Sequence, residues 1–344
     1  MPKFSSLPLT LAAAMAVLPS IGFADLSAEC SGKLADKRLL VIVPNAAGGG
    51  YDTYGRALAP VFEQVAGLRA DVVNMPGAGG IVALTRLTTS GPDDLVVMVE
   101  NINDVLGAER PDGAESWIDK VRMLGVFHNE PSAWFGRTGT LLDTPGTKFV
   151  AAAISSNEGV VEFKLGGQAI GLNIDTIAGY GGSKDMEAAV LRGEADLVSN
   201  SLTTSLKRAA SGDLEILMLL SDKPNPRAPG VPHLAGEDGL AAEYAKTLPA
   251  EDRALHIERA GLAADMSFDI RAIFSSATMR PDLQACLEEA AQEVIFSDAF
   301  REVAEKQGRP VTPMPADEVA AVLGRFATLQ SRLQDWQESD AAKQ

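Results

Sequence analysis

The sequence has few of the residues from which catalytic and metal centres are usually built. Its 344 residues include two cysteines and three histidines. The histidines, His128, His233 and His256, lack the spacing of metal ligands, and neither cysteine lies in a reactive motif. A Gly-x-Ser-x-Gly elbow is also missing. We therefore interpret each histidine as a surface or loop residue, and we expect no metal, no cofactor and no enzymatic activity.

The glycine-rich stretches of the chain lack the signatures of nucleotide sites. A phosphate-binding loop ends in Gly-Lys-Ser/Thr, whereas Gly50 is followed by Tyr51 and Asp52. The third glycine of a dinucleotide-binding fingerprint is replaced by Thr53 in the first stretch and by Val82 in the second. These stretches need another explanation, and plain turns without a ligand are the simplest one.

Long apolar runs are missing beyond the N-terminus, where none reaches the roughly 18 residues of a membrane-spanning helix. The first 24 residues differ from the rest of the chain. Lys3 precedes an apolar segment, residues 7–18, and Gly22 and Ala24 mark a small-residue cleavage site. The sequence thus predicts a signal peptide over residues 1–24 and a mature chain exported to the periplasm.

Basic residues are outnumbered by acidic ones, 30 to 46, which gives a net charge of −16. Loss of Lys3 with the signal peptide leaves 29 basic residues against 46 and a net charge of −17. This balance argues against nucleic acid and anionic membranes as partners. It does not exclude a small anionic ligand, because salt screens the global field beyond roughly 8 Å. Each N–H bond to a charged group, by contrast, contributes about 1.5–3 kcal/mol.

Export would place the two cysteines, Cys30 and Cys286, in an oxidising compartment. A disulfide between them would join the mature N-terminus to a C-terminal helix. The sequence leaves this disulfide and a pair of unpaired thiols equally open.

The chain is organised around residues 39–80, where two strands each end in a glycine-rich loop. Leu39–Val43 is apolar and β-branched, which is typical of a buried strand, and Asp71–Asn74 forms the second strand. Each loop leads into a helix with apolar residues on one face. Two such loops at one edge of a parallel sheet present bare N–H groups, and helix dipoles, to the same point.

This arrangement predicts an anion-binding site. Glycine is suited to it because side chains would block the ligand and because several residues need positive φ. The candidate residues of the first loop are Ala47, Gly48, Gly49, Gly50, Tyr51 and Asp52, and those of the second loop are Pro76, Gly77, Ala78, Gly79 and Gly80.

The second half of the chain repeats this pattern of strands followed by polar turns. Ligands in open α/β sheets lie at the carboxyl ends of strands. We therefore expect the turns of this half to face the first two loops, together with the residues after the strand at 95–99. The candidate residues are Asn101, Ser155, Ser156, Tyr180, Gly181, Gly182, Ser183 and Asn200.

Several of these positions also have a purely structural interpretation. Asp52 suits a helix cap better than a catalytic role, and Arg56 suits an ion pair with Asp52 better than a ligand contact. Asn101 equally fits a turn or a helix cap. The tyrosines beside the loops, Tyr51 and Tyr180, either line a cleft or pack at the base of each loop.

The order of strands and helices predicts an α/β chain of two lobes. The polar region at 138–148 and the proline-rich region at 224–232 are the expected crossings. The first lobe then comprises residues 25–136 and 224–344, and the second comprises residues 137–223. The segment 236–264 shows little periodicity, and the last helices are expected to pack on the first lobe.

Four stretches of the chain resemble one known family. The first loop, read from Pro44 to Arg56, resembles the first signature of the extracytoplasmic tricarboxylate-binding receptors, the Bug or TctC-like family. The stretch 74–80, Asn-Met-Pro-Gly-Ala-Gly-Gly, is similar to the family's second loop. Residues 179–183 with 191–196 are similar to its second-lobe loop, and 228–232 to its proline-rich return. The chain departs from the family's pattern at 153–157, 232–236 and 236–265.

The resemblance implies a two-lobed type II periplasmic binding fold that closes on a small di- or tricarboxylate. Such a receptor is a monomer that delivers its ligand to the membrane permease subunits of a tripartite tricarboxylate transporter. Two other functions fit the same cleft. One is a secreted enzyme acting on a carboxylate, and the other is a receptor that serves a sensor kinase.

Overall fold

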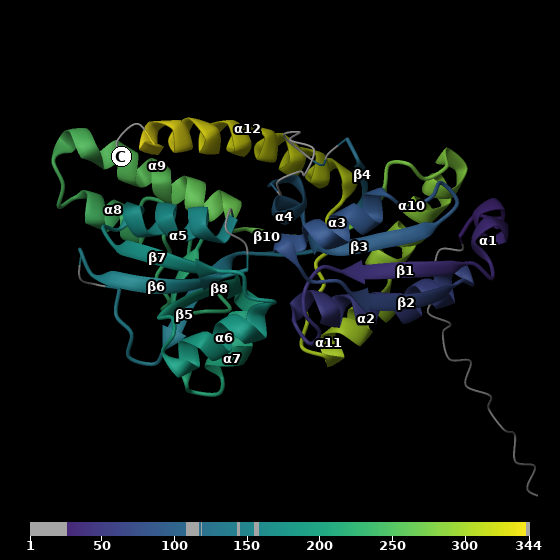
Figure 1. Cartoon of the computed structure of the whole chain (residues 1–344), viewed down its shortest axis with the longest axis horizontal. Helices are drawn as coiled ribbons and strands as arrows, with labels where there is room; N and C mark the ends of the chain where they lie inside the picture. Colours follow the sequence, from purple (N-terminus) through teal and green to yellow (C-terminus); the bar gives the residue numbers. More distant parts are fainter. Residues whose placement is uncertain (1–25, 108–116, 118, 143–144, 155–157, 342–344) are drawn as a thin grey trace, which may run out of the picture.

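The computed structural model describes residues 26–107, 117, 119–142, 145–154 and 158–341. Two α/β lobes lie side by side, each built on a five-stranded sheet (Figure 1). The chain therefore has the two-lobed α/β fold that the sequence predicts. No helix within the described ranges is both long and apolar enough to cross a membrane.

The sheet of the first lobe has the strand order β2-β1-β3-β10-β4. β1 is parallel to both β2 and β3, whereas β10 is antiparallel to β3 and β4. Its strands are β1 (Arg38–Val43), β2 (Arg69–Asn74), β3 (Leu95–Asn101), β4 (Val121–Glu130) and β10 (Asp269–Ser276). Its helices are α1 (Ala28–Leu34), α2 (Gly50–Ala66), η1 (Ala78–Gly80), α3 (Ile81–Thr88), α4 (Ile102–Gly107), α10 (Pro281–Phe296) and α11 (Asp298–Lys306).

The sheet of the second lobe, β7-β6-β8-β5-β9, repeats the same arrangement. β6 is parallel to β7 and β8, and β5 is antiparallel to β8 and β9. Its strands are β5 (Ser132–Arg137), β6 (Lys148–Ala153), β7 (Asn173–Ala178), β8 (Leu197–Ser201) and β9 (Leu214–Leu220). Its helices are α5 (Glu158–Ala169), α6 (Ser183–Arg192), α7 (Leu202–Ala209), α8 (Leu240–Ala245) and α9 (Ala250–Met266).

The strand before the first loop, β1, and the helix after it, α2, are buried at the positions that their sequence patterns predict. β1 is buried from Val41 to Val43, as expected of a central parallel strand. In α2 the predicted face is buried at Tyr54, Leu58 and Phe62. α2 is therefore held on the core of the first lobe, because burial of these side chains removes apolar surface from water, and the loop that precedes α2 is fixed at that end.

The chain crosses between the lobes at positions other than those predicted. β5 is a strand of the second sheet, so the first crossing lies at Pro131 and not beyond residue 136. The second crossing lies at 267–268, because α9 packs against α5 of the second lobe before β10 enters the first sheet. The segment 236–265 therefore belongs to the second lobe. Its apolar side chains are buried there, at Leu262 for example.

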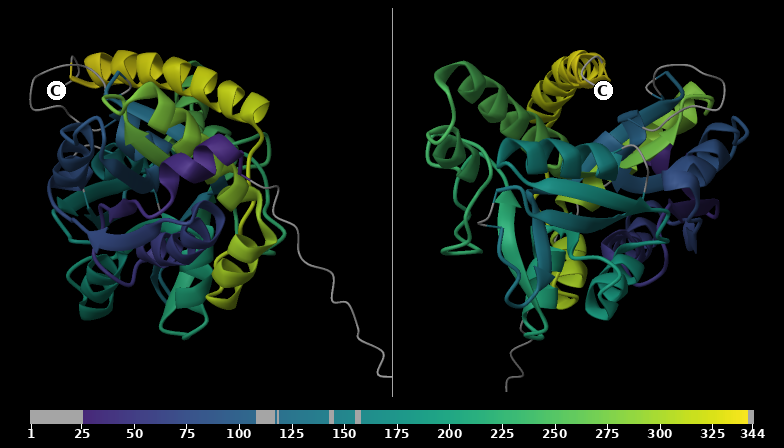
Figure 2. Two further views of the ribbon diagram at one scale, coloured as in Figure 1. Left: turned by 90° about the vertical axis from the view of Figure 1, so that its right-hand side faces the viewer. Right: turned by 60° about the vertical axis from the view of Figure 1, so that its left-hand side comes forward.

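The last helix, α12 (Ala316–Ala341), contacts both lobes and not the first alone. Val319 and Leu323 pack on a cluster of the first lobe, whereas Leu329 and Trp336 are buried in the core of the second. Figure 1 shows this helix along the top of both lobes, and Figure 2 shows it on the same edge from two other directions.

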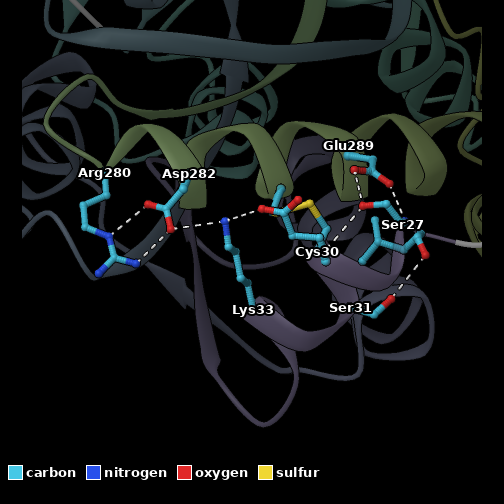
Figure 3. Close-up of a disulfide and its surroundings, with 10 residues drawn as sticks. Ser27, Cys30, Ser31, Lys33, Arg280, Asp282 and Glu289 are labelled. Carbon is cyan, nitrogen blue, oxygen red and sulfur yellow. Dashed lines mark hydrogen bonds and ion pairs between the residues drawn. A yellow bond between two sulfur atoms is a disulfide. The ribbon is translucent and has the colours of Figure 1, made fainter.

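Cys30 and Cys286 form a disulfide, with their Cα atoms 4.9 Å apart. It joins α1 to α10, and polar contacts surround it (Figure 3). The Ser27 backbone and hydroxyl both donate to Glu289, and Lys33 bonds to Glu29 and Asp282. Of the two possibilities that the sequence left open, the structure has the disulfide.

Candidate functional site

The two predicted glycine loops lie side by side. They follow β1 and β2, which are adjacent parallel strands, so both loops emerge at the same edge of the sheet. The Asn74 side chain donates to the Asn45 carbonyl oxygen at 3.0 Å, and the Met75 N–H donates to Val43. The N-termini of α2 and α3 therefore point into one region, each with first-turn N–H groups that the helix itself leaves unpaired.

The first loop is closed partly by the chain's own carboxylate. Asp52 lies in the first turn of α2, and its Oδ2 accepts the Gly48 N–H at 2.7 Å. Its Oδ1 lies 2.9 Å from the Arg56 guanidinium, which also donates to Asn74. Asp52 and Arg56 thus have the predicted structural roles. The Gly48 N–H, which we had assigned to the ligand, is already bonded.

The electrostatics of Asp52 reflect these bonds. Burial raises the pKa of this carboxyl, but hydrogen bonds from Arg56 and Gly48 outweigh burial and hold the pKa below its usual range. Asp52 is therefore ionised at neutral pH. It acts as a fixed anion that shapes the loop.

The second loop has an unusual backbone that glycine permits. Gly77, Ala78, Gly79 and Gly80 all have positive φ, from 48° to 139°. Left-handed conformation is rare for a residue with a Cβ, so Ala78 is strained there. The Gly80 N–H donates to the Gly77 carbonyl oxygen at 3.1 Å and so closes this turn. Turns of successive peptide groups are one kind of backbone from which anion-binding concavities are built.

The loop of the second lobe contacts the first loop directly. The Ala46 N–H donates to the Gly181 carbonyl oxygen at 3.2 Å, and Gly182 packs against Ala46. Lys184, on α6 of the second lobe, places its ammonium where a Cβ on Gly48 would lie. The lobes therefore meet at the predicted glycine loops.

A cavity of about 150 Å³ lies between the lobes next to these loops. Both lobes and the crossing at 267–268 contribute to its wall. The residues that line it are Tyr51, Asn101, Asp104, Ser132, Ala152, Ala153, Ile154, Gly159, Glu162, Phe163, Met186, Ser199, Asn200, Met266, Ser267 and Asp269. A larger cavity of about 550 Å³ lies under α12, where Thr328 and Leu329 line it. None of the predicted site residues lines the larger cavity, whereas Tyr51, Asn101 and Asn200 line the smaller one, so we take the smaller cavity as the candidate site.

Tyr51 connects the first loop to the wall of the cavity. Its hydroxyl donates to Asp269 at 2.6 Å, and the Arg271 guanidinium lies over its ring at 5.0 Å. Burial, followed by the charge of Asp269, raises the pKa of Tyr51 well above its usual value. Tyr51 also packs on the core of the first lobe. It therefore has both of the roles that the sequence left open.

Asn101 and Asn200 line the cavity from opposite lobes. The Asn101 Oδ1 accepts the N–H groups of Asn103 and Ile270, so this side chain caps α4 and also fixes β10. The Asn200 Oδ1 accepts the Ser183 hydroxyl at 2.9 Å. Its Nδ2 is buried and has no partner within the described part of the chain. Asn200 thus offers a donor to whatever occupies the cavity.

Behind the cavity, a buried polar cluster joins the two lobes near the first crossing. Glu130 Oε2 accepts from the Thr203 hydroxyl at 2.6 Å and from Arg227 at 2.8 Å. Arg309, on the first lobe, donates to Thr204 at 2.9 Å. Burial raises the pKa of Glu130, but contacts with His128 and the charge of Arg271 lower it far below its usual range.

This cluster corrects our interpretation of two histidines. His128 is buried within β4, where its Nδ1 lies 2.9 Å from the Thr312 hydroxyl. Burial is the largest cause that lowers the pKa of His128, so the ring is neutral at neutral pH. His233 is also buried, next to Asp238. Both histidines belong to the packed interior, not to the surface.

The structure places the predicted site residues in three groups. Tyr51, Asn101 and Asn200 line the cavity. Apart from Tyr51, the glycine loops do not line it, although the first loop contacts Gly181, and Ser183 bonds to the lining residue Asn200. Tyr180 packs half-buried against a second-lobe cluster, which favours its core interpretation. Ser155 and Ser156 lie outside the described residues.

The sequence did not indicate the acidic residues of the cavity wall, Asp104, Glu162 and Asp269. Asp104 follows the predicted Asn101 turn, so its position at a strand end was the only available signal. Asp269 begins β10, which lies between β3 and β4 in the first sheet although it comes more than 130 residues after them in the sequence.

A scan against models of protein families finds no match, and a search of curated proteins finds none either. Comparison with solved structures shows that the chain has the fold of two-lobed solute-binding proteins. A TctC solute-binding protein from Polaromonas, solved without ligand, has 17% sequence identity and a TM-score of 0.57. The match covers 87% of this chain and 98% of that one.

Two further similar structures contain ligands. MatC from Rhodopseudomonas palustris, with bound malate, has 19% identity and a TM-score of 0.62 over 88% of this chain and 98% of that one. Rpa4515 from R. palustris, with adipate, has 16% identity and a TM-score of 0.63 over 87% and 97%. BugD shares the fold as well, with a TM-score of 0.60. The resemblance seen in the sequence is thus confirmed at the level of the fold, and these neighbours are solute-binding proteins, not enzymes.

Proposed function

We propose that this chain is an extracytoplasmic receptor that binds a small organic carboxylate between its lobes. The observation that supports this most strongly is that two adjacent glycine loops, at the N-termini of α2 and α3, lie at the edge of the sheet where the first loop meets the second lobe, and that Tyr51 of the first loop lines an interlobe cavity. Similar structures with malate and adipate have the same fold.

In this proposal the N–H groups at Gly49 to Tyr51 and at Ala78 and Gly79 hold one carboxylate. The Gly80 N–H, which the sequence assigned to the same role, instead donates to Gly77 and closes the loop. Ser183, Asn200 and the loop at 180–183 contact the ligand from the second lobe. Ser155 and Ser156 are proposed for the same role. Contacts with both lobes give the closed form a higher affinity than the open one, and this difference is what moves the equilibrium toward closure.

The route of the protein and its partners are part of the same proposal. The signal peptide over residues 1–24 directs the chain to the periplasm, where the mature monomer delivers its ligand to the permease of a tripartite tricarboxylate transporter. An oxidising compartment agrees with the disulfide between Cys30 and Cys286.

Isothermal titration of the mature chain with malate, adipate and citrate tests the proposal. We expect a dissociation constant near the micromolar range, about −8 kcal/mol, for at least one carboxylate in a wider panel of mono-, di- and amino carboxylates. The ligand recovered afterwards should be chemically unchanged. Turnover of the ligand would instead point to an enzyme.

A matched pair of variants tests the loop itself. Gly80 (φ +91°) and Gly212 (φ +85°) both have left-handed backbone, and a Cβ at either position meets no atom closer than 3.8 Å. Gly80→Ala and Gly212→Ala therefore strain the backbone to a similar degree. Only Gly80→Ala should weaken carboxylate binding. Equal effects of the two variants would contradict the assignment of the second loop.

A further inference from the structure

Two buried arginines lie next to the first glycine loop. A Cβ on Gly50, the first residue of α2, would lie 3.5 Å from the Arg309 Nη1 atom and 3.7 Å from the Arg271 Nη2 atom. Arg309 is 5% exposed and Arg271 is 2% exposed. Two guanidinium groups are therefore shielded from solvent beside the helix terminus whose N–H groups we propose as the carboxylate site.

The charge of Arg271 is balanced by carboxylates. Asp269 bonds to Arg271, and Glu130 lies 3.8 Å from the same guanidinium. Glu130 is shared between two cations, because it also bonds to Arg227 at 2.8 Å. These two arginines and two carboxylates together carry no net charge.

Arg309 is the guanidinium that this group leaves without a counter-ion. Among the described residues it forms no ion pair, and its Nη1 donates at 2.9 Å to the neutral hydroxyl of Thr204, on α7 of the second lobe. Its Nε is buried and has no hydrogen-bond partner within the same part of the chain. A buried charge is stabilised by a nearby charge of opposite sign, so this guanidinium favours an anion in its surroundings.

Neighbouring groups respond to the same excess of positive charge. Burial, and then the charge of Arg271, lower the pKa of Arg309. Burial, followed by the charges of Arg309 and Arg208, lowers the pKa of Lys207 on α7. Burial raises the pKa of Glu187 on α6, and the charge of Arg208, its partner at 2.6 Å, opposes burial more strongly than that of Arg309 does. Positive charge therefore exceeds negative charge where the second lobe covers Arg309.

This excess lies at the positive end of a helix dipole. α2 has 17 residues, and the acidic residue of its first turn, Asp52, is paired with Arg56. The first N–H groups of the helix carry partial positive charge. The charge of Arg309 adds to theirs, and burial leaves it little screened by water or salt. A chain with a net charge of −16 thus contains one local region that favours anions.

We infer that Arg309 makes the first glycine loop select ligands by their negative charge, acting electrostatically across Gly50 and not by contact. Arg309 is not among the residues that line the candidate cavity. The inference rests on the proposed function, because it takes the N–H groups of this loop as the place where a carboxylate binds. It adds a residue that determines selectivity and that lies outside both loops.

The experiment compares ligands of one skeleton that differ in charge. The mature chain is titrated by calorimetry at pH 7 with succinate and its monoamide, with adipate and its monoamide, and with any tighter carboxylate of the panel above and its monoamide. In Arg309→Gln we expect the dissociation constant to rise about tenfold for the dianion and about threefold for the monoanion. The lost attraction is proportional to the charge of the ligand, so the two changes differ.

Three further variants separate charge from structure. Arg309→Lys retains the positive charge and should restore most of the affinity. Thr204→Val removes the hydroxyl that Arg309 bonds but keeps the charge, so any effect should be equal for the two ligands of a pair. Arg301→Gln removes a charge from α11 of the same lobe, at a side chain that is 40% exposed and paired with Asp298. It should change neither dissociation constant, since salt and water screen an exposed charge.

The outcomes separate this inference from the proposed function. Binding of the monoanion shows that a variant is folded. Equal changes for dianion and monoanion in Arg309→Gln, or no change for either, would overturn the inference and leave the carboxylate receptor standing. A loss in Arg309→Lys as large as that in Arg309→Gln would do the same. Failure of every carboxylate to bind the wild type would overturn both.

Discussion

At the scale of single residues, Asp52 shows how one side chain of the protein shapes the first glycine loop, where we propose that an anion binds. Its carboxylate takes one N–H of the glycine loop, at Gly48, and is held in turn by Arg56. The loop is therefore set before a ligand arrives, and the ligand does not have to order it. Preorganisation of this kind lowers the entropic cost of binding.

Replacement of Asp52 tests this. Asp52→Asn weakens two charge-assisted contacts of a buried side chain, so we expect a loss of about 1–3 kcal/mol in the free energy of unfolding and weaker ligand binding. Asp71→Asn is the control, because it breaks an ion pair of similar length, 3.0 Å, between exposed side chains. Arg38 is 75% exposed and Asp71 is 58% exposed. Its cost should stay below about 1 kcal/mol. Urea unfolding measures both, and equal costs would contradict the role of Asp52.

A second residue, Glu130, should make stability depend on pH. Its pKa is strongly lowered in the folded protein, so its contribution is complete above the unfolded value of about 4.3 and is lost as the pH falls below it. Chemical unfolding between pH 3 and pH 7 should show this loss. In Glu130→Gln the curve should be flatter below pH 4.3 and lower at pH 7. An unchanged pH slope in the variant would show that other carboxyls cause the loss.

The sequence identified some residues of the site because they occupy positions with a general rule. Asn101 and Asn200 lie at the carboxyl ends of β3 and β8, and Tyr51 follows β1. Each of these strands has a parallel neighbour, and ligands of open α/β sheets lie at such strand ends. Asp269 and Glu162 follow no such rule. Asp269 enters through the antiparallel strand β10, and Glu162 projects from within a helix, so only the packing of the lobes brings them to the cavity.

At the scale of elements, the sequence predicted those strands and helices whose periodicity is strong. β1, α2, β2, α3 and β9 lie where the patterns place them. β5 and α9 were misassigned to loops or to the other lobe. β5 contains the apolar Trp134 and Phe135, but the sequence analysis assigned these residues to the first lobe, just before the predicted crossing. The strands that β5 pairs with, β8 and β9, come more than 60 residues later in the chain. The pairing is nonlocal, so no local pattern reveals it.

The disulfide between α1 and α10 gives a prediction at this scale. It closes a loop across a sequence separation of 256 residues, for which chain-entropy arguments give a stabilisation of up to about 5 kcal/mol. The Cys30→Ser, Cys286→Ser double variant should therefore have a free energy of unfolding lower by roughly 2–5 kcal/mol. Its unfolding midpoint should lie at a lower urea concentration. Ligand affinity should be unchanged, since the disulfide is remote from the cavity. The control is the wild-type chain with its disulfide reduced, which should have the same free energy of unfolding as the double variant. A double variant as stable as the oxidised wild type would contradict the prediction.

At the scale of the whole molecule, Ala46 of the first lobe and Gly182 of the second lie in contact where the lobes meet. A Cβ on Gly182 would lie 3.4 Å from the Ala46 Cβ, which is ordinary packing distance. Gly182→Ala should thus bind ligand almost as the wild type does. Gly182→Leu should keep the lobes apart and weaken binding by about tenfold, from an overpacking cost of about 1–3 kcal/mol.

Small-angle X-ray scattering measures lobe closure in the Gly182→Ala and Gly182→Leu variants through the radius of gyration. The wild type and Gly182→Ala should reach the same radius of gyration with ligand, whereas Gly182→Leu should remain larger. Identical compaction of all three with unchanged affinities would mean that the loops of the two lobes do not meet in the bound form.

The C-terminal helix also determines where the protein can open. A helix of 26 residues is about 39 Å long, and α12 is anchored by Leu323 on one lobe and by Leu329 and Trp336 on the other. Separating the lobes along that edge would expose these apolar side chains to water. Separating them at the opposite edge would break mainly polar contacts. If the protein is the receptor proposed above, its ligand would enter and leave at the edge opposite α12, and a partner that receives the ligand would contact that edge and not the helix.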